Sequence, residues 1–288
     1  MNGELDILVS FLLGALQGLT EFLPISSTAH IRILPAFLNL PDVGAAYTAV
    51  IQLGSLIALF FYFNKDLKDF FIQSINLTKT LNFKENKFSL LNFSNWNYEA
   101  RMPIYLIIGT IPISIFGLLF KDWIKGPFRS LYVIAFSLIF FSILLLIADI
   151  ISKKNKRIQE LSTKDAFLIG FAQALALIPG ASRSGVTLMA GLFLNFNREA
   201  SMRYSFLLSI PAIALSGFYE LWKDWKELQN LGFFSVSIGV ASATIVSYLT
   251  IIGLLKYLRN HSTLIFVIYR ILLGIFILIL LYFQILKD

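Results

Sequence analysis

Two segments of the chain place polar and charged side chains within apolar surroundings. Residues 14–30 read GALQGLTEFLPISSTAH, and residues 170–185 read GFAQALALIPGASRSG. Each segment runs from a glycine through a glutamine to a proline and then to a cluster of hydroxyl side chains. The first adds a carboxylate and an imidazole, whereas the second adds a guanidinium. We interpret the segments as copies of one element whose complementary charges form one composite site.

The first segment supplies the candidates for acid, base and nucleophile. Glu21 follows Gln17 by four residues, so both lie on one helix face. Glu21 could bind a hard divalent cation through oxygen or hold a basic partner, and the alternative is a carboxylate that only caps or pairs within its own segment. A hydroxyl nucleophile needs a base within hydrogen-bond reach, and His30 lies four residues after Ser26 and three after Ser27. We expect Ser27 to be the nucleophile.

The other polar residues of this segment are candidates for binding substrate. Ser26, Ser27 and Thr28 follow Pro24 and can start a helix, so simple helix capping is the alternative for any one of them. Three hydroxyls together are difficult to explain by capping alone. We therefore expect Gln17, Ser26 and Thr28 to contact substrate beside the catalytic group.

The second segment has the composition of an anion site. Glycines such as Gly180 and Gly185 allow a close backbone approach, and N–H groups at a helix start bind anions. Arg183 adds a planar fork suited to phosphoryl oxygens, although an arginine that only reaches the membrane surface is the alternative. The hydroxyls of Ser182 and Ser184 can donate further hydrogen bonds. Thr187, one turn beyond Arg183, is a candidate for the same site or for packing.

Together the two segments predict cleavage of a phosphoanhydride. This chemistry needs a nucleophile, charge stabilisation on the transferred group and a proton donor for the leaving oxygen. The sequence contains no G-x-x-x-x-G-K-[ST] loop, so it does not support nucleotide hydrolysis. It also contains no cysteine, which excludes thiol catalysis and disulfides.

The composition predicts an all-α polytopic membrane protein. Of the 288 residues 57% are apolar and only 14% are charged, and mean hydropathy is +0.75. The net charge of +7 fits basic cytoplasmic loops rather than a nucleic-acid partner. Acidic residues Glu4 and Asp6 near the start do not resemble a cleavable signal. We expect one membrane domain, residues 1–288.

Six spans are expected from continuous apolar stretches, at 44–63, 104–121, 130–151, 204–222, 233–256 and 264–285. The polar stretch 64–101 is expected to be a solvent or interfacial loop. The regions 5–40 and 165–197 are apolar but broken by proline and serine-rich turns. Because broken backbone at membrane depth must be covered by protein or line a cavity, we expect both to be re-entrant helix hairpins.

Charge counting predicts the orientation of these elements. The basic residues are concentrated in 64–101, 152–164 and 257–262, which would share one face, and the positive-inside rule makes that face cytoplasmic. Both termini would then lie outside. Residues 1–151 and 165–288 would form inverted-topology repeats, each a re-entrant hairpin plus three transmembrane helices, with the site near the midplane between them.

Two further basic side chains, Arg203 and Arg270, are weaker candidates. Arg203 is expected near the cytoplasmic start of a span, and Arg270 is expected within a span, where it must be paired. His261 follows Arg259 in a basic turn and is expected to be a solvated loop residue.

The chain resembles the bacterial undecaprenyl-diphosphatase family, also called bacitracin-resistance proteins. The resemblance covers the whole chain and is most specific at 17–30 and 179–185, with support at 51–54 and 203–208. It implies hydrolysis of undecaprenyl diphosphate to undecaprenyl phosphate and inorganic phosphate. This reaction recycles the lipid carrier for peptidoglycan and other wall polymers and confers bacitracin resistance. It also implies a site that opens to the outer face of the bacterial inner membrane.

The resemblance also implies roles for individual residues and the presence of a cofactor. It implies that Glu21 holds metal or orients the base, that Ser27 attacks, that His30 serves as base and then acid, and that Arg183 clamps the diphosphate. It implies a divalent cation, Mg²⁺ or Ca²⁺. Gln17 stands where the family frequently has a second Glu, which weakens a two-carboxylate metal site.

Three alternatives stay open at this point. Inverted repeats with broken helices are also a carrier architecture, so a carrier that moves polyprenyl phosphate across the membrane is the alternative. A homo-oligomer is possible beside a monomer. A covalent serine intermediate and an activated water are equally compatible with the sequence.

Overall fold

The fold is known from a computed structural model, which describes residues 6–37, 44–80, 96–223, 228 and 231–286. The described residues are mostly helical, and their only strand-like pairing is an isolated bridge between Lys156 and Phe196. The principal helices are α1 (Ile7–Phe22), α2 (Ser27–Phe37), α3 (Gly44–Tyr62), α4 (Asn64–Thr80), α5 (Tyr98–Leu119), α6 (Lys121–Lys125), α7 (Leu131–Ile151), α8 (Thr163–Gln173), α9 (Arg183–Phe193), α10 (Arg198–Lys223), α12 (Phe233–Asn260) and α13 (Leu264–Tyr282).

The expected membrane spans are present as long apolar helices. Five of the described helices (α5, α7, α10, α12 and α13) are long and apolar enough to cross a bilayer. The sixth expected span corresponds to α3, which passes the same test together with α4 across a bend of 70°. The chain is therefore an all-α polytopic membrane protein, as its composition predicts.

The expectation of a loop over 64–101 is wrong at both of its described ends. Residues 64–80 form α4, and α5 already begins at Tyr98. The many lysines and aspartates of α4 made this segment look like a polar loop. Its apolar stripe contains Leu67 and Phe70, which are three residues apart, and Phe70 is buried. Asn97 caps α5 by accepting a hydrogen bond from the backbone N–H of Ala100 at 3.2 Å.

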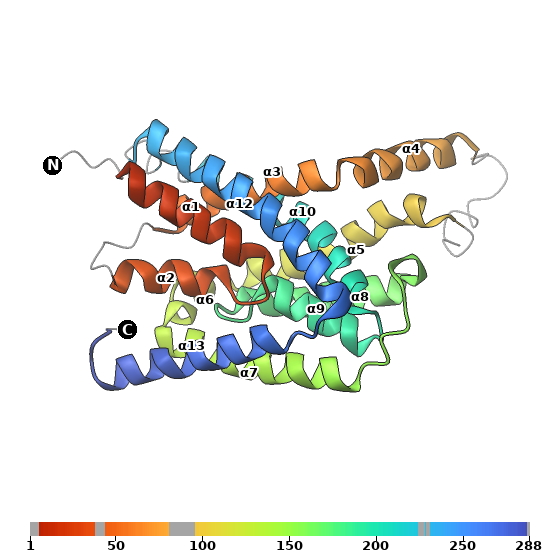
Figure 1. Cartoon of the computed structure of the whole chain (residues 1–288). Helices are drawn as coiled ribbons and strands as arrows, with labels where there is room; N and C mark the ends of the chain where they lie inside the picture. Colours follow the sequence, from red (N-terminus) through yellow and green to blue (C-terminus); the bar gives the residue numbers. More distant parts are fainter. Residues whose placement is uncertain (1–5, 38–43, 81–95, 224–227, 229–230, 287–288) are drawn as a thin grey trace.

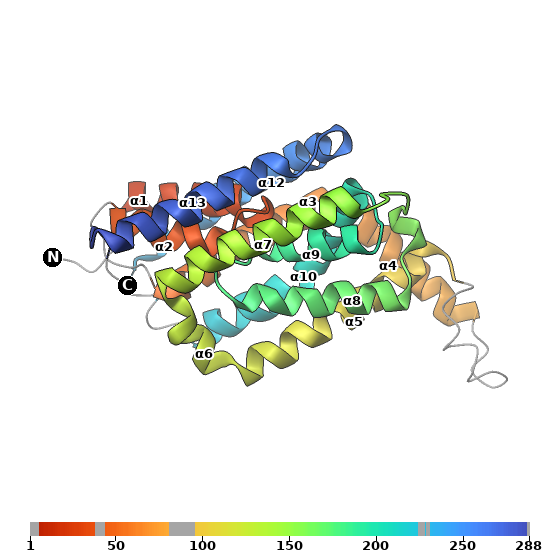
Figure 2. The ribbon, with the colours of Figure 1, turned by 90° about the horizontal axis from the view of Figure 1, so that it is seen from below.

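Both motif regions form broken helix pairs, as expected. The first is α1 followed by α2, and the second is α8, a short 3₁₀ segment (Ala174–Leu177) and α9. The turns of the two pairs meet in the middle of the molecule (Figure 1). Helix α1 lies against α12 and α3, while α7 and α13 run side by side (Figure 2).

The first helix of each pair packs closely against a neighbouring helix at a glycine. A Cβ on Gly14 of α1 would collide with the carbonyl oxygen of Gly239 on α12, and a Cβ on Gly170 of α8 would collide with that of Gly109 on α5. Small residues permit this approach between membrane helices. The two contacts would be equivalent if the halves 1–151 and 165–288 were inverted repeats, and that relation stays a prediction.

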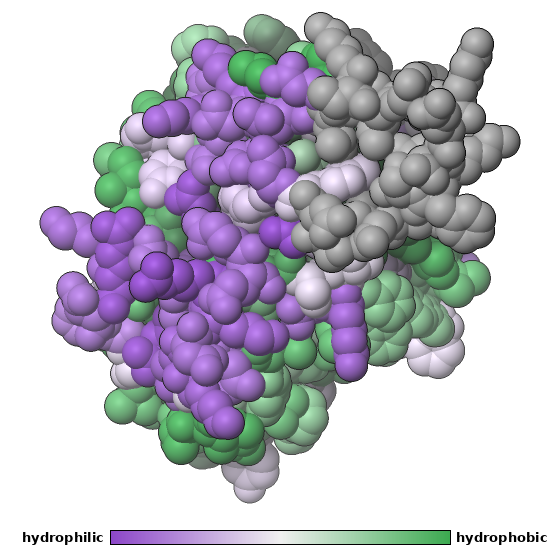
Figure 3. Space-filling view, turned by 90° about the vertical axis from the view of Figure 1, so that its right-hand side faces the viewer, coloured by the Kyte–Doolittle hydropathy of each residue, from purple (hydrophilic) through white to green (hydrophobic). Residues whose placement is uncertain are grey.

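The molecule has two distinct ends along its helices. We call one of them the α6 end. It carries the start of α1, the whole of α6 and the end of α13 (Figures 1 and 2). The opposite α4 end carries α4, the linker 152–162 and the turn between α12 and α13. Seen from that side, the surface is largely hydrophilic (Figure 3). His261 at this turn is exposed, as expected.

Candidate active site

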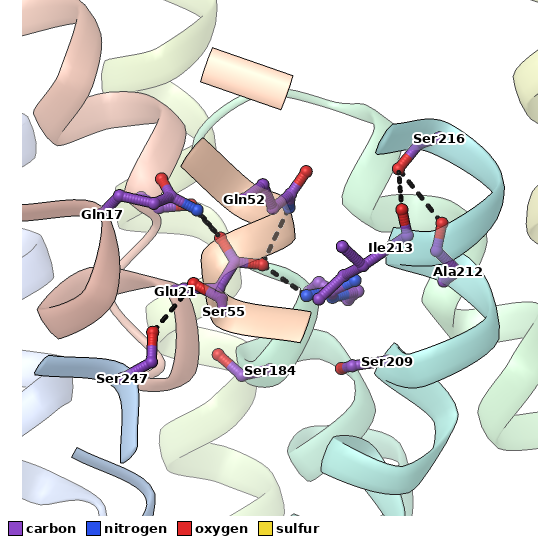
Figure 4. Close-up of polar contacts among 12 residues, drawn as sticks. Gln17, Glu21, Gln52, Ser55, Ser184, Ser209, Ala212, Ile213, Ser216 and Ser247 are labelled. Carbon is purple, nitrogen blue, oxygen red and sulfur yellow. Dashed lines mark hydrogen bonds and ion pairs between the residues drawn. The ribbon is translucent and has the colours of Figure 1, made fainter. Parts of the chain in front are cut away.

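Glu21 is the centre of the site. Its Oε2 accepts hydrogen bonds from Nε2 of Gln17 at 2.6 Å and from Oγ of Ser27 at 2.8 Å. Its Oε1 accepts one from Nε2 of Gln52 at 2.9 Å and forms an ion pair with Nη2 of Arg183. Figure 4 shows Gln17 and Gln52 pointing at the carboxylate from opposite sides.

These five side chains come from four helices. Gln17 lies one turn before Glu21 on α1, Gln52 is on α3, and Ser27 and Arg183 are the first residues of α2 and α9. The Glu21 side chain is 3% exposed and that of Arg183 is 13% exposed. A buried carboxylate is stable only when it is paired and hydrogen-bonded, and this one has four donors. The site is therefore built at the junction of the two motif segments.

The backbone has the same conformation at the residue that ends each of the two turns. Ser26 and Ser182 immediately precede α2 and α9, and both have positive φ, 73° and 69°. This left-handed region disfavours side chains, and such strain persists where surrounding contacts fix the turn. Ser182 also accepts a hydrogen bond from the N–H of Gly185 at 3.2 Å. The strained turns start two helices at the site.

Arg270 of α13 ties the turns together. Its fully buried guanidinium donates to the carbonyl oxygens of Pro24 at 3.3 Å, Gly180 at 3.0 Å and Ala181 at 3.0 Å. The expectation that Arg270 is buried and must be paired is correct, with backbone carbonyls as its partners. Gly180 (φ 91°) is required here because a Cβ would approach the carbonyl oxygen of Ile134 to 2.5 Å.

Other hydroxyls of the second segment lie behind the turn. Ser184 Oγ donates to the carbonyl of Leu23 at 3.0 Å and so links the two hairpins. Thr187 Oγ1 lies 2.6 Å from Ser205 Oγ, within the packing between α9 and α10. The alternative of a packing role fits Thr187 in this structure. Gly185 faces Arg270, whose Nη1 would lie 2.9 Å from an added Cβ.

His30 has partners other than Ser27. Its Nδ1 lies 2.7 Å from the carbonyl oxygen of Ser26, and its Nε2 lies 2.6 Å from the hydroxyl of Tyr269. The carbonyl can only accept, so Nδ1 carries the proton and Nε2 accepts from Tyr269. The expected pairing of Ser27 with His30 is replaced by one of Ser27 with Glu21, because Ser27 at the helix start points back toward α1.

A cavity of about 730 Å³ opens onto this centre. At its inner end it is lined by Gly180 and by polar side chains from both hairpins and from α3, namely Glu21, Ser26, Ser27, Thr28, Gln52, Ser182 and Arg183. Apolar side chains of α5 and α10 and of the segment before Pro179 line much of the remainder. Most expected site residues thus share one cavity, while Gln17, Ser184, Gly185, Thr187 and His30 lie outside its lining.

Sequence reasoning missed Gln52 and Tyr269 as site residues, and its weaker candidate Arg203, near the start of α10 as expected, does not line the cavity. Gln52 had a detectable signal, because it is an amide within the apolar helix α3. Tyr269 had none that separates it from other membrane tyrosines. Arg203 pairs with Asp66 and lies 5.2 Å over the ring of Phe63, near the bend between α3 and α4.

The residues around Glu21 do not fit a divalent cation built on protein ligands. Mg²⁺ and Ca²⁺ prefer six or more oxygen ligands. Both oxygens of Glu21 face N–H or O–H donors, and one donor is a cation. No group of three or more His, Cys, Asp or Glu residues gathers anywhere in the part of the chain that the structure describes. The expectation of Mg²⁺ or Ca²⁺ at Glu21 stays a prediction.

Comparison with known proteins places this site in a family. The family model described as bacitracin resistance protein BacA matches residues 10–276. The chain belongs to the BacA family. Three relatives in it are each named undecaprenyl-diphosphatase. The protein of Chloroherpeton thalassium is 45% identical over 286 residues, which cover 96% of this chain and 97% of the relative. That of Chlorobium phaeovibrioides is 46% identical, covering 94% and 96%, and that of Syntrophobacter fumaroxidans is 42% identical, covering 94% and 95%.

The BacA match spans every element described above that carries the site. It begins within α1, before Glu21, and ends within α13, after Arg270. The recognised family resemblance is thereby confirmed over nearly the whole chain. Membership does not by itself assign the roles of individual residues, which have to be argued from the geometry.

Proposed function

We propose that this chain is a membrane phosphatase that hydrolyses undecaprenyl diphosphate to undecaprenyl phosphate and inorganic phosphate. One observation carries the proposal: a buried carboxylate joins a hydroxyl and a guanidinium at the inner end of one cavity. These groups supply a nucleophile, an acceptor for its proton and charge stabilisation for the transferred phosphoryl group. The names of the relatives supply the substrate, and the membrane spans explain how a polyprenyl chain reaches the site.

In the proposed reaction Arg183 and the N-terminal ends of α2 and α9 bind the diphosphate oxygens. The Ser27 oxygen, or a water in its place, forms a bond to the terminal phosphorus while the bond to the bridging oxygen breaks. The lipid phosphate leaves with that electron pair. If Ser27 attacks, water then hydrolyses the phosphoserine and restores the hydroxyl, so both routes consume one water.

The geometry supports Glu21 as the group that takes the proton from Ser27, because the two are hydrogen-bonded at 2.8 Å. Arg183 has to exchange Glu21 for phosphate oxygens, at least in part, when substrate enters. That exchange frees a lone pair of Glu21. His30, expected from the sequence as the base, is given the role of holding the turn that carries Ser27 through the Ser26 carbonyl.

The proposal also covers the membrane in which the protein lies, its orientation there and its oligomeric state. We place the protein in the bacterial inner membrane with the α6 end outside, because the basic linker 152–162 lies at the α4 end. The reaction would recycle the lipid carrier for peptidoglycan and would protect cells from bacitracin. A homo-oligomer stays compatible with this arrangement.

A carrier that moves polyprenyl phosphate is the competing function. A carrier needs an anion site but no nucleophile, so the Ser27–Glu21 pair favours hydrolysis. The names of the relatives point the same way. The transport reading therefore takes second place.

Phosphate release from polyprenyl diphosphate by purified protein in lipid nanodiscs tests the proposal. We expect turnover by the wild type and a loss of about 100-fold or more in Arg183→Ala, which removes the phosphate clamp. Lys164→Ala, an exposed basic residue at the α4 end, serves as control. Full activity in Arg183→Ala would refute the catalytic assignment, and full activity in His30→Ala would refute the positioning role given to His30. Lipid movement in proteoliposomes without phosphate release would favour the carrier.

A further inference from the structure

The catalytic cavity continues from Glu21 to a charged mouth. Two helices supply the charges there, with Lys121 and Asp122 on α6 and Glu220 and Lys223 on α10. All four residues line the same cavity as Ser27 and Arg183 in the described part of the chain. The mouth lies at the α6 end, where Figure 2 shows α6 between the end of α5 and the start of α7.

A polar stripe on α10 connects the two regions. Ser216, Tyr219, Glu220 and Lys223 line the cavity at spacings of three, four and seven residues, so they share one helix face. Ala212 lines its inner part, and eleven residues of helix separate it from Lys223, or about 16 Å. The cavity thus has a hydroxyl-bearing and then charged wall that leads from the site to one end of the bundle.

The two products of the proposed reaction differ in the route they need. The lipid phosphate keeps its prenyl chain and can leave sideways into the bilayer. Inorganic phosphate is an anion and fully hydrophilic, and an apolar route would cost it on the order of tens of kcal/mol of lost hydration. It needs an opening with hydrogen-bond donors and positive charge, which the mouth provides.

The charges of the mouth favour weak, short-lived binding of inorganic phosphate over tight binding. Two ammonium groups attract the phosphate, while the neighbouring carboxylates of Asp122 and Glu220 limit how tightly it is held. Conduction requires a site that is favourable enough to enter and weak enough to leave. Lys121 and Lys223 are exposed, which also keeps the attraction modest and dependent on salt.

We propose that Lys121 and Lys223 form a transient site for inorganic phosphate at the mouth of the catalytic cavity, through which this product leaves. The inference rests on the proposed function for the source of the phosphate. The site itself recognises a free phosphate dianion and does not require the lipid.

Product inhibition by inorganic phosphate tests this proposal. In Lys121→Gln/Lys223→Gln we expect the inhibition constant for phosphate during hydrolysis of a short-chain prenyl diphosphate to rise about threefold to tenfold at low salt. The difference from the wild type should shrink at 0.5 M salt, because exposed charges are screened. Lys121→Arg/Lys223→Arg should behave as the wild type. An unchanged inhibition constant in the glutamine double variant would overturn the proposal.

A matched control and a binding measurement separate this inference from the proposed function. Lys164→Gln/Lys256→Gln removes two exposed lysines outside the cavity and should leave the inhibition constant unchanged. An equal shift in this control would attribute the effect to net charge and overturn the proposal. Phosphorus NMR of inorganic phosphate with the detergent-solubilised protein needs no hydrolysis. Weaker binding in the Lys121/Lys223 glutamine variant would support the mouth site even if the wild type hydrolysed no diphosphate, whereas equal binding would exclude it.

Discussion

Glu21, in the last turn of α1, forms an ion pair with Arg183, the first residue of α9. The two residues are 162 positions apart, and each belongs to the broken helix pair of one half of the chain. Neither half can build this centre alone, since the carboxylate and hydroxyl come from one hairpin and the guanidinium from the other. The site therefore requires both hairpins to be docked, and Arg270 holds the docked turns.

Loss of the Glu21 charge should abolish most activity. Glu21→Gln keeps the shape but removes the proton acceptor for Ser27 and leaves Arg183 without its counter-ion. We expect phosphate release to fall about 100-fold or more. Glu199→Gln, which removes a more exposed carboxylate paired with Arg259, should stay within about twofold. Comparable losses in both variants would argue against a special role for Glu21.

Gln52 should act by orienting Glu21. Gln52→Met keeps the volume and removes the 2.9 Å hydrogen bond to Oε1. Because a hydrogen bond to a charged group contributes about 1.5–3 kcal/mol, kcat should drop about tenfold or more. A positioning role predicts that Gln52→Glu does not rescue, since it places a second carboxylate against Glu21. Wild-type kcat in Gln52→Met would contradict this role.

Arg270 should matter for stability as well as activity. In Arg270→Met the carbonyls of Pro24, Gly180 and Ala181 lose their donor, so we expect the free energy of unfolding to fall by about 2–4 kcal/mol. Thermal unfolding in detergent measures this, and Arg270→Lys should lose less. An unfolding temperature equal to that of the wild type would mean that the turns are held by other contacts.

The glycine contact between α1 and α12 gives a test of packing with an internal control. Gly14→Ala forces a methyl group into the Gly239 carbonyl and should destabilise the fold by about 1–3 kcal/mol. Gly253→Ala on α12 meets nothing within 4 Å and should be neutral or stabilising by up to about 1 kcal/mol. The same thermal unfolding assay compares the two. The reverse order of stabilities would show that α1 does not approach α12 this closely.

Cation binding without substrate should be weak. Because Glu21 is surrounded by donors, calorimetry of the substrate-free protein should give dissociation constants for Mg²⁺ and Ca²⁺ of about 1 mM or weaker. Gln17→Glu replaces one donor with a second carboxylate and should tighten binding at least several-fold. Micromolar binding by the wild type would mean that the arrangement around Glu21 changes when metal is added.

The sequence was sufficient to predict the membrane class, the span positions and the residues of the two motif segments at the inner end of the cavity, but not the walls supplied by α5, α6 and α10. Apolar runs define the spans because the bilayer requires them, and charged residues at membrane depth mark the site because burial there is costly. We missed α4 because its many lysines and aspartates made the segment look like a polar loop, and of its two core-facing side chains Phe70 is buried and Leu67 only partly buried.

The sequence did not show which side chains pair with each other in space, even where two residues are close along the chain. Ser27 and His30 are three residues apart, yet the positive φ of Ser26 changes the direction of the chain between α1 and α2. This turn sends the Ser27 hydroxyl to Glu21 and leaves His30 against a backbone carbonyl and Tyr269. Gln52 and Tyr269 join the site only through tertiary contacts, which spacing along the chain does not record.

An experimental structure with a bound phosphate analogue such as vanadate tests the central claim most directly. The composite site predicts that its metal–oxygen core lies between the Ser27 hydroxyl and the Arg183 guanidinium, at the inner end of the cavity that Glu21 lines. An analogue bound away from both Ser27 and Arg183 would contradict the account.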